Sequence, residues 1–222
     1  RTLAENKRKE YLFESVRRHK PQWVEAGAST EVQKWINPGV KIPWIKEPPP
    51  PFHEGASMTD RTPHQDAWWQ KEKERLVDCG AWERGGDRRY VTKAFLVPKG
   101  PDKYRLVVDL RFLNSFVIEK KTKFETLKSL KRMAKKNDWM FSFDLEDGYY
   151  AIAIHPEDRP FFTVEVDGEL FQFVGLPMGW RLSPYIFCKT MRTLVQELRS
   201  PDAPKTELVR RSGKRRRMLL KW

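Results

Sequence analysis

One carboxylate in this sequence lies where a strand should end and a tight turn should begin. The run 139–145 is rich in aromatic and aliphatic residues, which is typical of a β-strand. Side chains alternate along a strand, so Asp144 should lie on the face opposite the apolar positions. Gly148 breaks the pattern, and Tyr149 and Tyr150 follow it. This arrangement suits a metal and nucleotide site, although an Asp that merely caps the next turn explains these residues at least as well.

Two apolar runs upstream, 94–98 and 105–110, predict a β-hairpin whose tip carries lysines. Lys99 lies at this tip, and Arg105 begins the second run. An ordinary solvated turn explains these cations, and so does a clamp for a triphosphate. Cations on a movable tip would suit a ligand that must enter and leave.

Two helices begin with the same signal, a hydroxyl residue followed by proline. The first is expected from Thr62-Pro63 to Gly80, where glycine suits a helix end. The second is expected from Ser183-Pro184 through Leu198. Between them, residues 175–180 contain two glycines and predict an irregular loop that leads into the second helix.

A basic helix is expected over 119–136, because Phe124, Leu127, Leu130 and Met133 recur at three-residue spacing. Its lysines suit a solvated face about as well as a surface that follows phosphates. Further strands are expected at 151–154, 161–166 and 169–174, and Asp167-Gly168 predicts a hairpin between the last two.

The chain as a whole is predicted to be α+β, with an antiparallel sheet and helices packed on one face. Residues 1–59 read as an N-terminal extension with a short helical patch near Trp23 and Trp35 and a proline-rich strap over 42–51. The strap should run extended along the surface, with an SH3-type ligand as the alternative. The expected division is 1–59, a unit over 60–138 and a unit over 139–222 with a basic tail.

The composition favours a polyanionic partner, because the 222 residues carry a formal net charge of +13. Nucleic acid comes first, an anionic membrane surface second, and an ordinary basic protein is the remaining explanation. Cys79 and Cys188 stand far apart without a ligand pattern, which predicts a reducing, intracellular setting and no zinc site. No apolar run approaches the roughly 20 residues of a membrane span.

Three motifs in order resemble the fingers and palm of reverse transcriptases, over roughly 60–200. They are the hairpin 94–99 running into 104–114, the segment 143–149, and the segment 171–187 with its Leu-Pro-Met-Gly-Trp loop. The resemblance implies a right-hand polymerase fold. The sequence Ser-Pro-Tyr-Ile-Phe and the N-terminal segment rich in tryptophan and proline resemble retrotransposons that encode a tyrosine recombinase more than they resemble retroviruses.

The resemblance also implies roles for single residues. Asp144 would bind catalytic Mg²⁺ or Mn²⁺, and the Leu145 carbonyl would complete the coordination. Tyr149 would close off the sugar 2′ position and so select deoxynucleotides. Lys99 and Arg105 would hold the triphosphate. The remaining residues would line the nucleotide site, at Met178 and Gly179, or contact template and primer, at Arg111, Asn114, Trp180 and Pro184.

The family's second carboxylate motif, a Tyr-x-Asp-Asp hairpin, is absent, since the sequence contains no Asp-Asp pair. We therefore expect an incomplete fingers and palm, cut before that hairpin, which binds dNTP and an RNA or DNA template-primer but does not extend the primer. Besides a structural protein derived from a retroelement, two other functions are compatible with the sequence. One is a nucleic-acid-binding module without catalysis. The other is an RNA-directed RNA polymerase, which Tyr149 at the gate position argues against.

Overall fold

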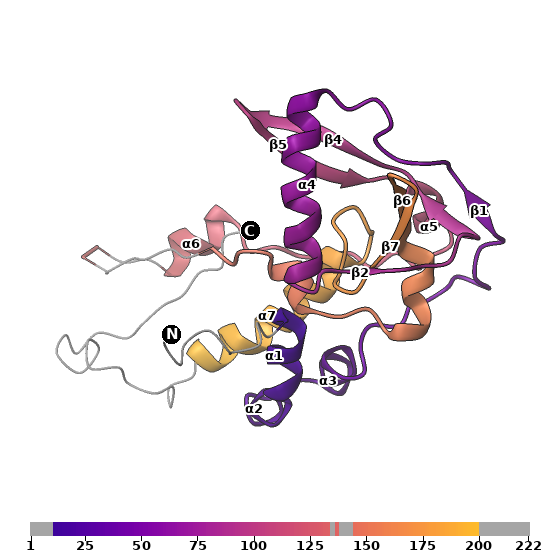
Figure 1. Cartoon of the computed structure of the whole chain (residues 1–222). Helices are drawn as coiled ribbons and strands as arrows, with labels where there is room; N and C mark the ends of the chain where they lie inside the picture. Colours follow the sequence, from indigo (N-terminus) through magenta and orange to yellow (C-terminus); the bar gives the residue numbers. More distant parts are fainter. Residues whose placement is uncertain (1–10, 134–135, 138–143, 200–222) are drawn as a thin grey trace, which may run out of the picture.

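In the part of the chain that the structure describes, the main sheet has five strands in the order β1-β3-β6-β7-β2. We obtained a computed structural model, which describes residues 11–133, 136–137 and 144–199. The sheet lies on the right of Figure 1. Its strands are β1 (Phe52–His53), β2 (Trp82–Arg84), β3 (Tyr90–Thr92), β6 (Thr163–Val166) and β7 (Glu169–Phe173).

Strand directions in this sheet are mixed. The pairs β6–β7 and β7–β2 are antiparallel, and the Asp167-Gly168 turn joins β6 to β7 as the sequence predicted. However, β1 and β6 both run parallel to β3. The prediction of an antiparallel sheet was therefore wrong for these two pairings. Parallel neighbours need long connections, and the sequence gives no local signal for them.

The second sheet is the predicted hairpin, formed by β4 (Ala94–Gly100) and β5 (Lys103–Val108). It projects from the main body at the top of Figure 1, beside the long helix α4 (Pro63–Asp78). Tyr104 packs edge-on against Trp68 of α4, with ring centroids 5.8 Å apart. This contact attaches one face of the hairpin to the helix and leaves the opposite face free of α4.

The start of α4 confirms the predicted cap. Thr62 Oγ1 accepts a hydrogen bond from the Gln65 backbone at 3.3 Å, and the Gln65 side chain accepts one from the Thr62 backbone at 2.9 Å. This reciprocal pair is a capping box. Within the helix, Trp69 is fully buried and meets Trp82 of β2, with ring centroids 5.8 Å apart. The helix is therefore fixed to the sheet by aromatic packing.

The N-terminal segment joins the same body. Its helices are α1 (Leu12–Arg18), α2 (Lys20–Glu25) and α3 (Thr30–Ile36), at the bottom of Figure 1. Beyond them Val40 bridges to Ile154, and Trp44 bridges to Val117. The strap contains no helix, has one bridge at Trp44 and bends at 45–47, and β1 then enters the main sheet; its extended course stays a prediction. The division at residues 59 and 138 stays a prediction, but the first segment contributes a strand to the sheet.

Two expected strands contain short 3-10 helices instead. The helix η1 (Gly148–Ala151) enters the expected strand 151–154, where only isolated bridges at Ala153 and Ile154 form. The helix η2 (Pro156–Phe162) takes the start of the expected strand 161–166. Pro156 and Pro160 remove backbone donors there, which prevents a ladder until β6 begins.

Three further helices complete the described structure. The predicted basic helix begins later than expected: residues 119–126 have no regular structure, and α6 is described over Leu127–Met133. The helix α5 (Arg111–Ser115) follows the hairpin. The helix α7 (Ser183–Arg199) begins where the sequence predicted.

The expected strand 139–145 falls mostly outside the described residues, and Asp144 and Leu145 have no regular structure.

Candidate nucleotide site

The turn that begins at Asp144 is exposed to solvent. An Asp144 carboxylate oxygen accepts a hydrogen bond from the Leu145 backbone at 3.0 Å. Three residues later Asp147 takes the left-handed conformation, with φ of 53°, and η1 begins directly afterwards. Asp144 thus offers a carboxylate at the surface, three residues before the point where the chain reverses.

Tyr149 is held by its contact with α7. Its ring meets Phe187 edge-on, with centroids 5.0 Å apart. The preceding Gly148 allows this approach, because a Cβ there would lie 2.8 Å from the Phe187 ring. Burial raises the pKa of the half-buried Tyr149 phenol, so the ring stays neutral at ordinary pH. The turn and the helix therefore form one packed unit.

The loop 175–182 is pinned by Asn114 of α5. The Asn114 amide nitrogen donates to the Gly179 carbonyl at 2.9 Å, and its oxygen accepts from the Arg181 backbone at 2.8 Å. Gly179 has φ of +100°, and a Cβ there would lie 3.0 Å from the Val108 carbonyl of β5. Only glycine combines this conformation with this close approach. The loop thus lies against the base of the hairpin.

Three other predicted site residues lie in this loop or just after it, in different environments. Met178 is 52% exposed, and Pro184 is half-buried at the first turn of α7. Trp180 is only 1% exposed and packs edge-on against Phe162, with centroids 5.3 Å apart. The assignment of Trp180 to template or primer stays a prediction. Its burial supports a role in shaping the loop rather than in touching a ligand directly.

The two hairpin cations differ in how the ladder places them. Arg105 pairs with Val97 across the ladder and so shares its face, opposite to the face of Tyr104. Lys99 lies at the irregularity between Pro98 and Gly100. Among the described residues, Lys99 and Arg105 form no ion pair, and no hydrogen bond joins either of them to Asp144. Both cations are exposed and available to an anionic ligand.

Arg111 differs from these cations because it already has a partner. Its guanidinium binds Asp109 through three hydrogen bonds, at 2.8 and 3.1 Å from Nε and 2.6 Å from Nη2. The hydrogen bonds from Arg111 lower the pKa of Asp109. Arg111 as a template or primer contact stays a prediction. Such a contact would have to form beside this ion pair or replace it.

The structure joins the predicted residues through a chain of contacts. The end of β5 meets Gly179, the loop after Gly179 enters α7, and α7 meets Gly148 and Tyr149 through Phe187. The backbone of Tyr150 also contacts Gly175, where a Cβ would lie 2.6 Å from the Tyr150 Cα. The hairpin base, the loop and the Asp144 turn therefore form one continuous region.

Sequence reasoning missed Arg75. This residue of α4 binds Glu72 in its own helix and Asp147 in the turn after Asp144. The available signal was weak, since Arg75 lies among several charged residues on the polar side of a helix. Nothing local in the sequence indicates that this particular side chain reaches residue 147.

As a metal site, the described residues supply an incomplete ligand set. Asp144 and the Leu145 carbonyl are hard oxygen donors of the kind that magnesium prefers. Within the described ranges no three His, Cys, Asp or Glu side chains gather closely enough to hold a metal ion. These two donors fit as part of a magnesium site that needs further ligands.

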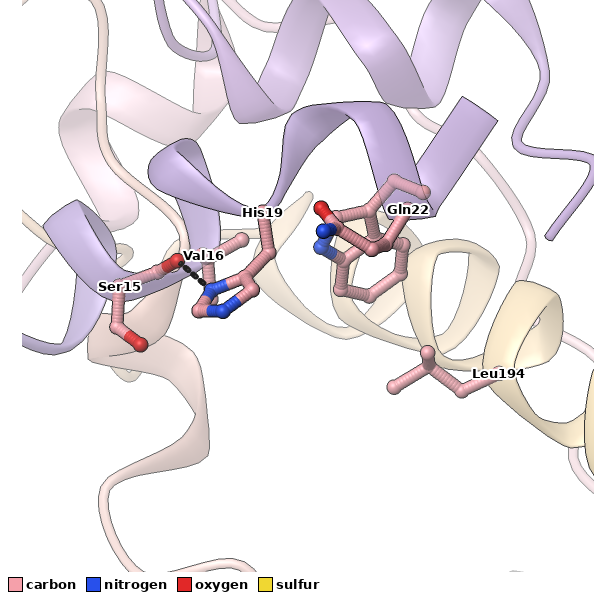
Figure 2. Close-up of a pocket in the computed structure, with 6 residues that line it drawn as sticks. Ser15, Val16, His19, Gln22 and Leu194 are labelled. Carbon is pink, nitrogen blue, oxygen red and sulfur yellow. Dashed lines mark hydrogen bonds between the residues drawn. The ribbon is translucent and has the colours of Figure 1, made fainter. Parts of the chain in front are cut away.

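A separate pocket lies on the N-terminal helices. It has a volume of about 270 Å³ and lies between α1, α2 and α7. Figure 2 shows His19 at its centre, with Nδ1 2.7 Å from the Ser15 carbonyl and Leu194 across the opening. Its lining contains none of the predicted site residues.

In the part of the chain that the structure describes, no helix has both the length and the apolar character needed to cross a bilayer.

Solved structures similar to this chain are polymerases. The native prototype foamy virus protease-reverse transcriptase gives a TM-score of 0.58 at 19% identity over 73% of this chain and 21% of that one. The foamy viral enzyme in complex with dsDNA gives 0.55 at 16% identity, over 86% of this chain and 42% of that one. At these identities the likeness establishes the fold, a partial reverse transcriptase polymerase fold.

Sequence comparison gives the family. The model described as reverse transcriptase (RNA-dependent DNA polymerase) matches residues 97–207, half of the chain. The Gag-Pol polyprotein of bovine immunodeficiency virus is 29% identical over 140 residues, and the Pol polyprotein of equine infectious anemia virus is 31% identical over 136. This chain spans 9% and 12% of their lengths. The chain belongs to the reverse transcriptase family. The activity of this family is RNA-directed DNA polymerisation.

Proposed function

We propose that this chain forms the fingers and part of the palm of an RNA-directed DNA polymerase that performs template-directed nucleotidyl transfer. The observation that carries the proposal is the packing of the Asp144–Tyr149 turn on α7, beside the loop that Asn114 pins to the hairpin base. This packing brings the surface carboxylate of Asp144, the half-buried Tyr149 and the exposed Met178 into one region. Phosphoryl transfer depends mainly on positioning and charge, which such a region can supply.

Asp144 and the Leu145 carbonyl would contribute ligands to magnesium. Bound magnesium would supply the positive charge that stabilises the attacking and leaving oxygens. Additional carboxylates must come from elsewhere, because the sequence contains no Asp-Asp pair. We infer that these 222 residues alone hold the metal weakly and do not extend a primer.

The other residues would bind and select the nucleotide. Lys99 and Arg105 are exposed cations that would neutralise the triphosphate. Tyr149, fixed against Phe187, would present a rigid ring that rejects a 2′ hydroxyl by steric conflict. Met178 and Gly179 would form the surface beneath the incoming base. RNA or DNA template-primer would lie along the loop and α5, near Asn114.

A primer-extension assay with dTTP on poly(A)–oligo(dT) tests the expectation for this chain. We expect no incorporation by the wild-type chain. Clear incorporation that Asp144→Ala abolishes would show that the chain supplies every carboxylate it needs, and the inference of an incomplete site would be wrong.

A second function, a nucleic-acid-binding module without catalysis, is favoured by the net charge of +13 and by the missing second carboxylate motif. Both functions include phosphate contacts, so salt dependence does not separate them. Nucleotide selection does, because only a polymerase site should prefer dNTP over rNTP.

Within the family, we further propose that the chain belongs to a retroelement that encodes a tyrosine recombinase. The sequence Ser-Pro-Tyr-Ile-Phe at the start of α7 supports this placement.

A further inference from the structure

A guanidinium from α4 lies against the turn that separates Asp144 from Tyr149. Arg75 binds Glu72 of the same helix through two hydrogen bonds, at 2.9 Å from Nε and 2.8 Å from Nη2. Its remaining terminal nitrogen, Nη1, donates to the Asp147 carboxylate. The bonds to Glu72 fix the plane of the guanidinium and aim Nη1 at the turn.

Asp147 is the residue at which this turn reverses. It has φ of 53° and ψ of 26°, and its carbonyl accepts a hydrogen bond from the Tyr150 backbone at 2.8 Å. A residue other than glycine is disfavoured in this left-handed region, although Asp tolerates it better than most. Such a conformation persists when the surroundings hold it. The side chain of Asp147 is bound here by Arg75.

The ion pair is shielded from solvent on its acidic side. Side-chain exposure is 20% for Asp147 and 19% for Glu72, against 41% for Arg75. The hydrogen bonds to Glu72 and then to Asp147 raise the pKa of Arg75. Burial, followed by the neighbouring carboxylates, raises the pKa of Tyr150 in the same turn. The guanidinium therefore offsets the charge of two carboxylates beside the half-buried phenol of Tyr150.

The residues that follow Asp147 in the turn are held by other contacts. Phe187 of α7 closes on Gly148 and Tyr149, and Gly175 closes on the backbone of Tyr150. The helix α1 also packs against η1, so the segment is contacted by α1 and α7 and is bound by Arg75 of α4. Loss of the Arg75 contact would let it move relative to the rest of the site.

We propose that Arg75 is a positioning residue for the nucleotide site. By holding Asp147, it fixes the turn that presents Asp144 and Tyr149, although it would touch neither the metal nor the nucleotide itself. The consequence for nucleotide selection rests on the proposed function. The mechanical part, that Arg75 holds the turn, does not.

Hydrogen–deuterium exchange on the full chain tests the mechanical part. In Arg75→Met, we expect backbone amides of 144–151 to exchange about tenfold faster than in the wild type, while those of β6 and β7 are unchanged. Arg84→Met is the matched control, because it removes an arginine paired with Glu169 at the sheet, in a different contact. Equal protection of 144–151 in wild type and Arg75→Met would overturn the proposal.

Asp147→Asn provides a second variant that tolerates the left-handed conformation and removes only the charge. It should speed exchange in 144–151 as Arg75→Met does, with little further change in the double variant. Arg75→Lys keeps a cation but loses the planar fork, so its exchange should lie between wild type and Arg75→Met. Full additivity of the two single changes would contradict a direct link.

The selection part is read from the ratio of dTTP to UTP affinities with Mg²⁺. We expect this ratio to fall at least threefold in Arg75→Met and Asp147→Asn, and to stay unchanged in Arg84→Met. A ratio unchanged in all variants would contradict the positioning of Tyr149. A wild type without any preference would contradict the proposed function instead, and the exchange data would still decide whether Arg75 holds the turn.

Discussion

At the scale of single residues, the site depends on side chains whose backbone is constrained. Gly179 and Gly148 occupy positions where a Cβ would meet a carbonyl or a ring. Asp147 occupies a left-handed position secured by an ion pair. The residue types at 144, 149 and 179 were predicted as functional from the sequence. The contacts that hold this site, such as those of Phe187 with Tyr149 and of Asn114 with Gly179, were not predicted from the sequence.

Removal of the Tyr149 ring should remove selection against ribonucleotides. In Tyr149→Ala we expect the ratio of dTTP to UTP affinities to fall toward one, because nothing then blocks the 2′ hydroxyl. Tyr149→Phe is the control, since it keeps the ring that packs on Phe187. Equilibrium binding with labelled nucleotides measures both. Selection that persists in Tyr149→Ala would assign the gate to another residue.

Gly179→Ala should destabilise the chain by about 1–3 kcal/mol, from the strained φ together with the close Val108 carbonyl. Gly85→Ala is the matched control, because Gly85 has a similar φ of +105° with nothing within 4 Å of its Cβ. Urea unfolding measures the free energy of unfolding of both variants. The additional loss of stability in Gly179→Ala is the cost of placing a Cβ against the Val108 carbonyl. Equal losses in the two variants would mean that the loop relaxes freely.

At the scale of elements, local signals predicted most of what formed. The cap at Thr62, the hairpin at 94–108, the Asp167-Gly168 turn and the helix from Ser183 were all confirmed. Each depends on a few neighbouring residues. The parallel pairing of β3 with β1 and β6 was missed, because it depends on partners far along the chain.

Other errors came from reading hydrophobic runs as regular elements. The apolar spacing over 119–136 predicted one long helix, but regular structure begins only at Leu127. The run before Thr163 predicted a strand, but its prolines favour η2. The Arg75–Asp147 and Asn114–Gly179 contacts join residues more than 60 positions apart, so no local pattern reveals them.

Thr62→Ala should cost about 1 kcal/mol of stability, because it leaves the Gln65 backbone N–H without its side-chain acceptor. Thr62→Ser keeps the hydroxyl and should cost much less. Chemical denaturation compares the two variants with the wild type. A loss in Thr62→Ser as large as that in Thr62→Ala would indicate that the methyl group, rather than the cap, matters.

The contact of α3 with α7 should make stability depend on pH. Burial opposes ionisation of Glu31, but hydrogen bonds from Lys189 and Lys120 outweigh it and lower its pKa. A lowered pKa in the folded state means that the stabilisation is present above the unfolded pKa of about 4.5 and is lost as pH falls through the folded value.

The stability difference between wild type and Glu31→Gln should therefore be present at pH 7 and shrink in acid. We expect about 1 kcal/mol or less at pH 7, because the pair is partly exposed. Urea unfolding at several pH values measures this difference. A difference that grows as the pH falls would contradict the assigned direction.

At the scale of the whole molecule, a basic body presents a carboxylate turn and a free cationic hairpin. The N-terminal helices, strap and β1 are part of this body through bridges at Val40 and Trp44 and through the sheet. Sequence reasoning located the polymerase motifs but described this segment as an extension. Its integration depends on distant pairings with residues such as Ile154 and Val117.

The net charge of +13 should make nucleic-acid binding sensitive to salt. We expect the affinity for a single-stranded oligonucleotide to fall roughly tenfold between about 50 and about 200 mM salt, because phosphate contacts release counterions. Fluorescence anisotropy measures this dependence. Affinity that does not change with salt would contradict an electrostatic mode of binding.

Magnesium-dependent nucleotide binding tests the central claim most directly. The affinity of the wild-type chain should be higher for dTTP than for UTP, should require Mg²⁺, and should fall sharply in Asp144→Ala but not in Asp102→Ala, a carboxylate at the exposed hairpin turn. Equal affinity for the two nucleotides, or binding that survives Asp144→Ala unchanged, would contradict a polymerase nucleotide site built on this turn.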